Sequence, residues 1–138
     1  MKGINHIAVV VSVILHQILG FLWYSPAPWV NTRLEALGRP LTEASAVDPV
    51  ALALDIVGWF LASYAIAWLI QKIGADTAAK GALLGLVLWL GLAVPTLVPH
   101  YAFAGLKLVV TVIDIANVLV ACVMTGAILA AWPKKPAT

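Results

Sequence analysis

Four long apolar runs dominate this chain of 138 residues and leave few folds open to it. Hydrophobic residues make up 63% of the sequence and charged residues only 10%, whereas soluble domains have about 25% charged residues. A helix needs about 20 mostly apolar residues to cross the hydrocarbon core of a bilayer. Runs of this length lie at about 4–24, 49–71, 79–98 and 106–132. We therefore predict an all-α integral membrane protein whose four transmembrane helices form a compact bundle in the lipid bilayer.

Residues that favour helix ends bound these spans. Asp48 can cap the first unpaired amides of a helix, and Pro49 fits the first helical position. A tryptophan, a proline and two lysines close the last span at 132–135. The spans fill a single domain, 1–138, and the outer loop 25–48 has room for one short interfacial helix around 29–37. The first span is longer than the apolar core of a signal peptide, about 7–15 residues, so we expect it to be retained.

Lysine and arginine predict the orientation. Four spans put both termini on one side, and positive residues are enriched on the cytoplasmic side of membrane proteins. The side of the termini has five lysines, and the other side has Arg33, Arg39 and Lys107. We therefore expect both termini in the cytoplasm. The five lysines are Lys2, Lys72, Lys80, Lys134 and Lys135.

Several functional classes lack support in the sequence. The net charge is only +2 and the basic residues are scattered, which argues against a nucleic-acid partner. The single cysteine, Cys122, lies in an apolar run and excludes an intramolecular disulfide. The serines lack the context of a catalytic nucleophile, and no glycine-rich phosphate loop or zinc-protease motif is present. We expect no cofactor and no catalytic constellation.

Four polar residues interrupt the apolar runs. They are His16, Asp55, Asp114 and Asn117. An ionisable group at the centre of a bilayer costs about 2.5–3.5 kcal/mol on insertion scales, so such residues mark a functional site by default. Their helical phase places each of them on a polar face, which should point into the protein.

The same geometry predicts the depth of these residues. At about 1.5 Å per residue, His16 and Asp114 lie about 12 Å, and Asp55 about 9 Å, below the outer ends of their helices. His100 and Lys107 belong to the short connection above them. We therefore predict a polar pocket that opens to the outer side. In a second interpretation, the carboxylates pair with Lys107, His16 or His100 only to fix helix packing. A mixed nitrogen and oxygen metal site is chemically conceivable, but the spacing does not require one, and we predict no metal.

The third span has small residues and prolines. Gly81 and Gly85 form a small-xxx-small pair, which lets two membrane helices approach closely. Pro95 and Pro99 each remove an amide donor and free a carbonyl one turn earlier. We therefore predict a broken helix from Pro95 to His100, at the depth of the acidic residues.

The sequence also resembles a known family. The block Gly20-Phe21-Leu22-Trp23-Tyr24-Ser25-Pro26, preceded by Ile4-Asn5, is similar to the domain-of-unknown-function family numbered 1761. The stretches 81–91 and 126–132 and the region of Pro95 are similar to it as well. The resemblance implies a bacterial, multi-pass inner-membrane protein with four helices and no assigned activity. It adds Trp23 and Tyr24 to the candidate pocket, although an interfacial aromatic belt also explains them.

Three functional hypotheses follow. In the first, the protein binds or passes a small polar solute or a proton at the outer pocket, as a homo-oligomer. In the second, it is an accessory or assembly subunit with a membrane-protein partner, which fits its small size. In the third, it is a membrane enzyme that uses acid–base chemistry of histidine and aspartate. The first is our main prediction.

Overall fold

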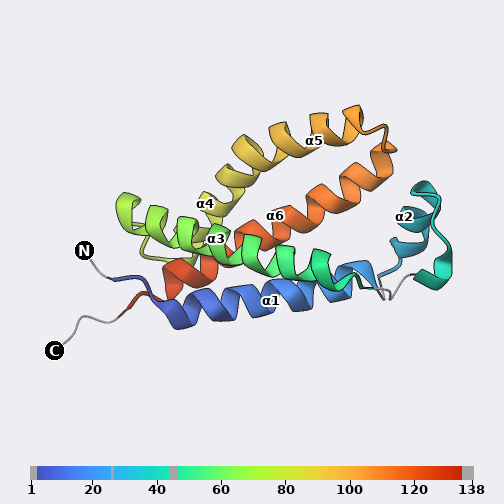
Figure 1. Cartoon of the computed structure of the whole chain (residues 1–138). Coiled ribbons are helices and arrows are strands. Elements are labelled where there is room, and N and C mark those ends of the chain that lie inside the picture. The colour runs from blue at the N-terminus through green and yellow to red at the C-terminus, as the bar shows by residue number, and fades with distance from the viewer. Residues whose placement is uncertain (1–2, 26, 44–46, 135–138) are drawn as a thin grey trace.

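The computed structural model describes residues 3–25, 27–43 and 47–134, and these residues form helices without any strand (Figure 1). Four helical stretches are long and apolar enough to cross a membrane, which confirms the predicted number. A short helix, α2 (Val30–Ala36), lies in the predicted outer loop, followed by a single 3₁₀ turn (Leu41–Glu43). The four long stretches are α1 (His6–Tyr24), α3 (Pro49–Ile73), the continuous stretch Ala78–Phe103, and α6 (Leu108–Ala131).

Side-chain caps and glycines set the helix ends. The side chain of Asn5 accepts hydrogen bonds from the amides of Ile7 and Ala8 and starts α1. Asp48 accepts from the amide of Val50 at 2.9 Å, with a proline at the first position of α3. Gly74 ends α3 with a φ of +68°, a left-handed conformation that glycine adopts without strain. The sequence signals at both ends of this helix therefore match the structure.

The third span differs from its prediction. We expected a span of about 79–98 with a broken helix from Pro95 to His100, but the helix continues from α4 (Ala78–Leu88) through a π turn (Trp89–Ala93) into α5 (Val94–Phe103). Because the amide of Val94 bonds to the carbonyl of Trp89, the chain is displaced by one residue just before Pro95. Pro95 then lies in the first turn of α5, where a missing amide donor is tolerated. Pro95 therefore follows a widened turn and Pro99 lies inside α5, so neither proline ends the helix.

Close contact between α4 and α6 follows from three glycines. A Cβ atom at Gly81 would overlap the carbonyl of Gly126, and one at Gly85 would overlap the carbonyl of Cys122. Helices in lipid associate through such close packing, because burial of apolar surface gives little driving force there. The predicted small-residue contact is confirmed, and it places α6 against α4. Gly91, by contrast, has open space at its Cβ position.

The two ends of the bundle differ. Both termini lie at one end, which we call the terminal end (Figure 1), and the Asn5 side chain donates there to the Trp132 carbonyl at 3.1 Å. The opposite end, with α2, is called the α2 end. Which end faces the cytoplasm stays a prediction. The main apolar core lies toward the terminal end, in a cluster of Ala8, Val9, Ile66, Ala67, Ile70, Ala75, Leu129 and Ala130.

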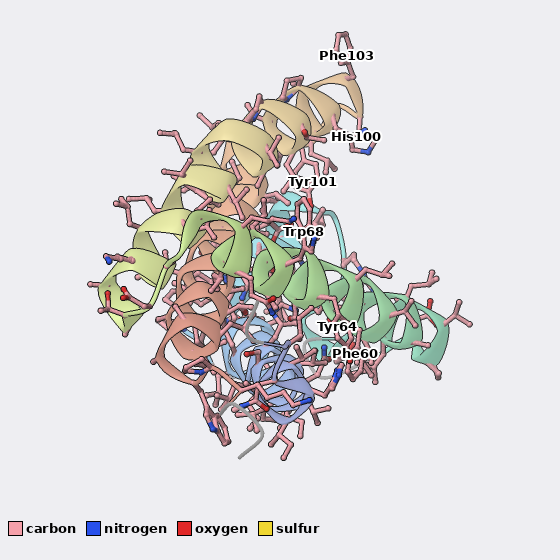
Figure 2. All side chains as sticks on the ribbon, turned by 90° about the vertical axis from the view of Figure 1, so that its left-hand side faces the viewer. Phe60, Tyr64, Trp68, His100, Tyr101 and Phe103 are labelled. Atoms are coloured by element: carbon pink, nitrogen blue, oxygen red, sulfur yellow. The ribbon has the colours of Figure 1, made fainter. Side chains whose placement is uncertain are left out.

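Aromatic side chains at the α2 end point in different directions. Figure 2 shows Tyr101 turned from α5 toward the other helices, whereas Phe103 projects away from them. Phe103 is 92% exposed, which suits the last turn of a membrane helix. The α5 helix ends just beyond it, near Gly105, which has a φ of +71°. Because the helix reaches this far, Tyr101 can contribute to the site described below.

Candidate functional site

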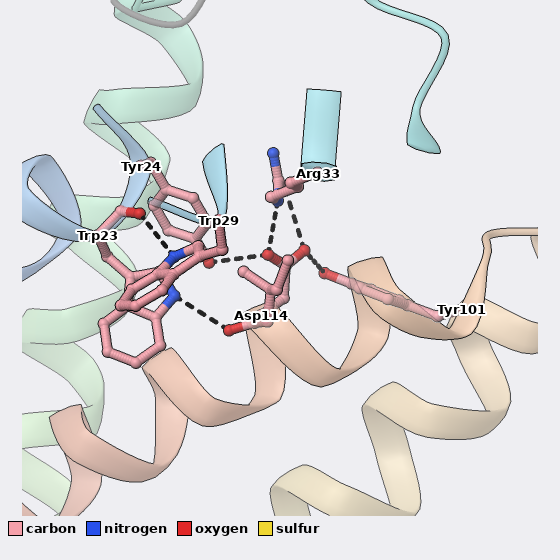
Figure 3. A network of polar contacts seen from close by, with 7 residues as sticks. Trp23, Tyr24, Trp29, Arg33, Tyr101 and Asp114 are labelled. Carbon is pink, nitrogen blue, oxygen red and sulfur yellow. Dashed lines mark hydrogen bonds and ion pairs between the residues drawn. The ribbon is translucent and has the colours of Figure 1, made fainter. Parts of the chain in front are cut away.

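Asp114 is the centre of a hydrogen-bonded network at the α2 end (Figure 3). Its carboxylate accepts two bonds from Arg33, from Nε at 2.8 Å and from Nη2 at 3.0 Å. The hydroxyls of Tyr24 and Tyr101 also donate to it, at 3.0 and 3.3 Å. The network joins α1, α2, α5 and α6 at one buried carboxylate. We call Asp114, Arg33, Tyr24 and Tyr101 the Asp114 latch.

Two indole rings support the latch. Trp23 donates from Nε1 to the carbonyl of Ile113 at 3.1 Å, next to Asp114. Trp29 donates to the carbonyl of Trp23 at 3.0 Å, and the two rings lie 4.7 Å apart (Figure 3). The tryptophan and tyrosine at the end of α1 therefore anchor α2 against α6. Of the two explanations for this block, the structure supports contact with the site.

The latch holds Arg33 in its charged form. Burial by itself would lower the pKa of Arg33, but the hydrogen bonds and the negative charge of Asp114 outweigh it, so the pKa is raised. The guanidinium also lies 4.8 Å from the centre of the Tyr24 ring, a cation–π contact. Bidentate pairing of this kind is specific to arginine. Asp114 is thus neutralised by a permanent cation and has two further donors.

His16 and Asp55 form a second polar group, on the facing sides of α1 and α3. His16 Nε2 lies 3.2 Å from Asp55 Oδ2, and Gln17 donates to the same oxygen at 2.8 Å. The imidazole packs on the Trp59 ring at a centroid distance of 3.9 Å. The His16 side chain is 6% exposed and the Asp55 side chain 46% exposed. Asp55 therefore presents a carboxylate at the surface of the bundle, while its histidine partner is enclosed.

One oxygen of Asp55 remains open. Both hydrogen bonds go to Oδ2, and Oδ1 has no hydrogen-bond partner among the described residues. A carboxylate oxygen has two lone-pair positions, so Oδ1 can accept from a bound group. Asp114 differs in this respect, because both of its oxygens already accept two hydrogen bonds each.

A cleft of about 720 Å³ joins the two groups. It extends from the Asp114 latch to the His16–Asp55 pair, and helices α1, α2, α3, α5 and α6 contribute to its walls. Asn117 lines it as well, and its side-chain Nδ2 is buried without a hydrogen-bond partner among the described residues. The volume lies within the range of small-molecule sites, about 300–1,000 Å³. The polar lining includes His16, Gln17, Tyr24, Arg33, Asp55, Tyr101, Asp114 and Asn117.

The structure brings together most of the predicted site residues but not all of them. His16, Asp55, Asp114, Asn117 and Tyr24 line the cleft, and Trp23 supports its wall. The polar groups do not form a single cluster at one depth, because Asp114 pairs with Tyr24 near the end of α1 and Asp55 pairs with His16 further inside.

 Counted along α1, His16 precedes Tyr24 by eight residues, which is a little over two turns, or about 12 Å.

His100 and Lys107 lie outside the cleft. His100 is exposed in the last turn of α5, and its ring lies 6.3 Å from that of Tyr101. Lys107 is exposed at the start of α6 and has no ion-pair partner in the part of the chain that the structure describes. Their expected place above the acidic residues assumed that the third helix ends before His100. The helix instead continues to Phe103 and includes His100, Lys107 directly precedes α6, and neither residue lines the cleft.

Sequence reasoning missed Arg33 and Tyr101. A signal for Arg33 was present, because it lies between Val30 and Leu34 on the buried side of the short predicted helix. Tyr101 follows the two prolines, and the expected break hid it. The candidate metal ligands do not converge either. Among the described residues, no group of three or more histidine, cysteine or acidic side chains lies close enough to hold a metal ion.

The chemistry of the two groups differs. The Asp114 latch is a satisfied ion pair that holds four helices together. In the His16–Asp55 pair, Asp55 lines the cleft and has one carboxylate oxygen without a partner among the described residues, and the buried imidazole Nδ1 has none among them either. A histidine–carboxylate pair can bind a cation or hold and transfer a proton.

Comparison with known proteins gives one result. A family model described as "Protein of unknown function (DUF1761)" matches residues 7–130, which include both polar groups and all four long helices. No curated protein and no solved structure matches the chain.

Proposed function

The chain belongs to the DUF1761 family of proteins of unknown function, and from its site we propose that it binds a small polar solute in the cleft. The solute donates hydrogen bonds, and a cation is preferred. Asp55 is the anchoring group. The single observation that carries the proposal is the open oxygen of a half-exposed carboxylate in a cleft of about 720 Å³.

The charges around the cleft favour a donor or a cation. The Arg33 guanidinium is occupied by Asp114, so it is not available to bind an anion. Apart from the Arg33–Asp114 pair, the charged lining residues are Asp48, Asp55 and Arg39, which leaves one excess negative charge. The Trp59 ring also lines the cleft, and an aromatic face next to a carboxylate attracts a small cation.

The latch forms part of the wall of the cleft and does not itself bind the solute. Each oxygen of Asp114 already accepts two hydrogen bonds, so a solute would have to displace a donor. Tyr24, Tyr101 and Arg33 instead fix the positions of α1, α5 and α2 around the cleft. In this proposal the latch preorganises the site, which lowers the entropic cost of binding.

We further propose that the protein lies in an inner membrane as a homo-oligomer with cytoplasmic termini. The orientation rests on the excess of lysines near the terminal end, where Lys72, Lys80 and Lys134 are found among the described residues. A fluorescent tag at the C-terminus that is quenched by an agent added only from the non-cytoplasmic side would contradict this orientation.

The proposal is tested by calorimetric titration of the protein in lipid nanodiscs. Guanidinium and urea are suitable probes, because they have the same shape and differ in charge. We expect guanidinium to bind more tightly than urea, and Asp55→Asn to weaken guanidinium binding by about 10- to 100-fold, the value of a hydrogen bond to a charged group. Asp76→Asn is the matched control, because Asp76 is exposed at the terminal end and pairs with Lys80 at 2.7 Å. Equal guanidinium affinity of the wild type and Asp55→Asn would reject the proposal.

A further inference from the structure

Polar side chains continue from the cleft into the packed interior of the bundle. Ser12 on α1, Ser63 on α3 and Thr125 on α6 have no exposed surface at all. They lie between the cleft and the apolar core of the terminal end. Apolar packing does not require hydroxyl groups in this position, so their arrangement indicates whether they have another role.

The contacts between α1 and α6 give the level of two of these hydroxyls. Tyr24 bonds to Asp114 at the α2 end. Ser12 lies twelve residues before Tyr24, and Thr125 lies eleven residues after Asp114. The two helices run in opposite directions, so at about 1.5 Å per residue Ser12 and Thr125 are at nearly the same depth. The bond from Asn5 to the Trp132 carbonyl, seven residues further along each helix, agrees with this register.

The contacts between α1 and α3 place the third hydroxyl. His16 pairs with Asp55, and His6 Nδ1 lies 3.0 Å from the Tyr64 hydroxyl. Ser63, next to Tyr64, is therefore about one helical turn beyond Ser12, toward the terminal end. The order of depth from the cleft is His16 and Asp55, then Ser12 and Thr125, then Ser63.

A second cavity begins one turn beyond Ser63 and Thr125. It has a volume of about 320 Å³ and lies at the terminal end. Ala67 and Leu129 line it, and each is four residues after one of these hydroxyls on the same helix. Asn5 and Gln71 supply polar groups to its wall. The buried hydroxyls therefore lie between two cavities at opposite ends of the bundle.

The hydrogen bonding of these groups differs. Ser12 donates to the carbonyl of Ala8 at 2.8 Å, as hydroxyls in helices commonly do. Ser63 Oγ, Thr125 Oγ1 and His16 Nδ1 are buried and have no hydrogen-bond partner among the described residues. Most buried polar atoms in proteins are paired, so unpaired ones call for an explanation. Three of them in sequence between two cavities indicate a path for a hydrogen-bonded species.

We propose that these groups form a proton path from the cleft to the cavity at the terminal end. This inference rests on the proposed function, because Asp55 in the cleft is also the entry group. The observation that carries it is the buried series His16 Nδ1, Thr125 Oγ1 and Ser63 Oγ, three atoms without a hydrogen-bond partner among the described residues. In this proposal the proton is the species that crosses the membrane, and it enters at Asp55.

In this proton transfer, each group of the protein that gains a proton also gives one up. Asp55 takes up a proton from the cleft and gives it to Nε2 of His16, which then releases its other proton from Nδ1. Each hydroxyl accepts one proton and gives up its own, and the last one is released into the cavity at the terminal end. Reorientation of the imidazole ring then turns the unprotonated Nδ1 toward Asp55 and the protonated Nε2 toward the path, so that the next proton enters at Nδ1 and leaves from Nε2. Successive groups differ in depth by about one helical turn, about 5.4 Å, and the proposal requires water molecules to complete the hydrogen-bonded chain between them.

Proton flux into liposomes tests the path. The protein is reconstituted with a pH-sensitive dye inside the liposomes, and an ionophore for potassium removes the membrane potential after a pH jump. We expect the wild type to equilibrate faster than protein-free liposomes. Thr125→Val and Ser63→Ala should each slow this equilibration by about tenfold or more, because a positioned proton-transfer group is lost. Thr125→Ser keeps the hydroxyl and should conduct like the wild type.

The controls separate this inference from the proposed function. Thr111→Val removes a buried threonine of the same helix near the α2 end, outside the path, and should leave proton flux unchanged. Guanidinium binding should be retained in Thr125→Val and Ser63→Ala, which also shows that these variants fold. Wild-type flux equal to that of protein-free liposomes would overturn the path. Unchanged flux in a variant that combines Thr125→Val with Ser63→Ala would overturn it as well. Guanidinium binding that persists in that case would leave the proposed function standing.

Discussion

Asp55 and Asp114 both interrupt apolar helices, but their surroundings differ. Asp114 is 6% exposed and accepts from Arg33, Tyr24 and Tyr101. Asp55 is half-exposed and keeps one oxygen open toward the cleft. A carboxylate with all its lone pairs occupied supports the fold, whereas an open one can bind a ligand. We therefore propose a structural role for Asp114 and a ligand-binding role for Asp55.

Stability measurements distinguish the two roles. Asp114→Asn removes the charge that pairs with Arg33 and should lower the free energy of unfolding by about 2–4 kcal/mol, because a largely buried cation loses its partner. Asp55→Asn should lower it by less than about 1 kcal/mol, since the pair at His16 is half-exposed. Reversible unfolding in detergent micelles measures both values. Equal losses of stability in the two variants would contradict the assignment.

The sequence predicted the polar residues better than their partners. His16, Asp55, Asp114 and Asn117 are visible because ionisable and amide groups are rare in apolar helices. Arg33 lies in the predicted outer loop 25–48, and only the packing of α2 against α6 brings it to Asp114. The position of Arg33 beside Val30 and Leu34 indicates a buried side of α2, but it does not indicate which carboxylate the guanidinium reaches.

At the scale of the helices, caps and hydropathy predicted the spans well. Asp48 and Pro49 start α3 as expected, and the last span ends at Ala131, one residue from its predicted end. The third span was predicted too short, because a proline inside a helix usually breaks it. The π turn at Trp89–Ala93 removes the conflict, but such a turn depends on packing against neighbouring helices as well as on the sequence.

The contact between α4 and α6 gives a prediction at this scale. Gly85→Ala should lower the free energy of unfolding by about 1–3 kcal/mol, because the new methyl group overlaps backbone atoms of Cys122 and Val123. Gly91→Ala is the matched control in the same span, since its Cβ position is open. Thermal unfolding in one detergent compares the variants. A Gly91→Ala variant that loses as much stability as Gly85→Ala would contradict the packing.

The whole molecule divides into two parts along its length. The terminal end is packed around small apolar residues such as Ala8, Ala67 and Ala130. At the α2 end, by contrast, the helices surround the cleft and are joined through the Asp114 latch. Composition and hydropathy predicted the membrane class and the four spans. They did not predict this division, because it depends on where the helices pack closely and where they leave space for a solute.

The central claim is that the cleft binds a small polar solute through Asp55. The most direct test is an experimental structure of the protein in lipid nanodiscs with guanidinium. We expect density for guanidinium in the cleft, with a nitrogen about 2.7–3.2 Å from Asp55 Oδ1, and the Asp114 latch intact. A cleft filled by side chains or lipid, with guanidinium absent from Asp55, would contradict the account.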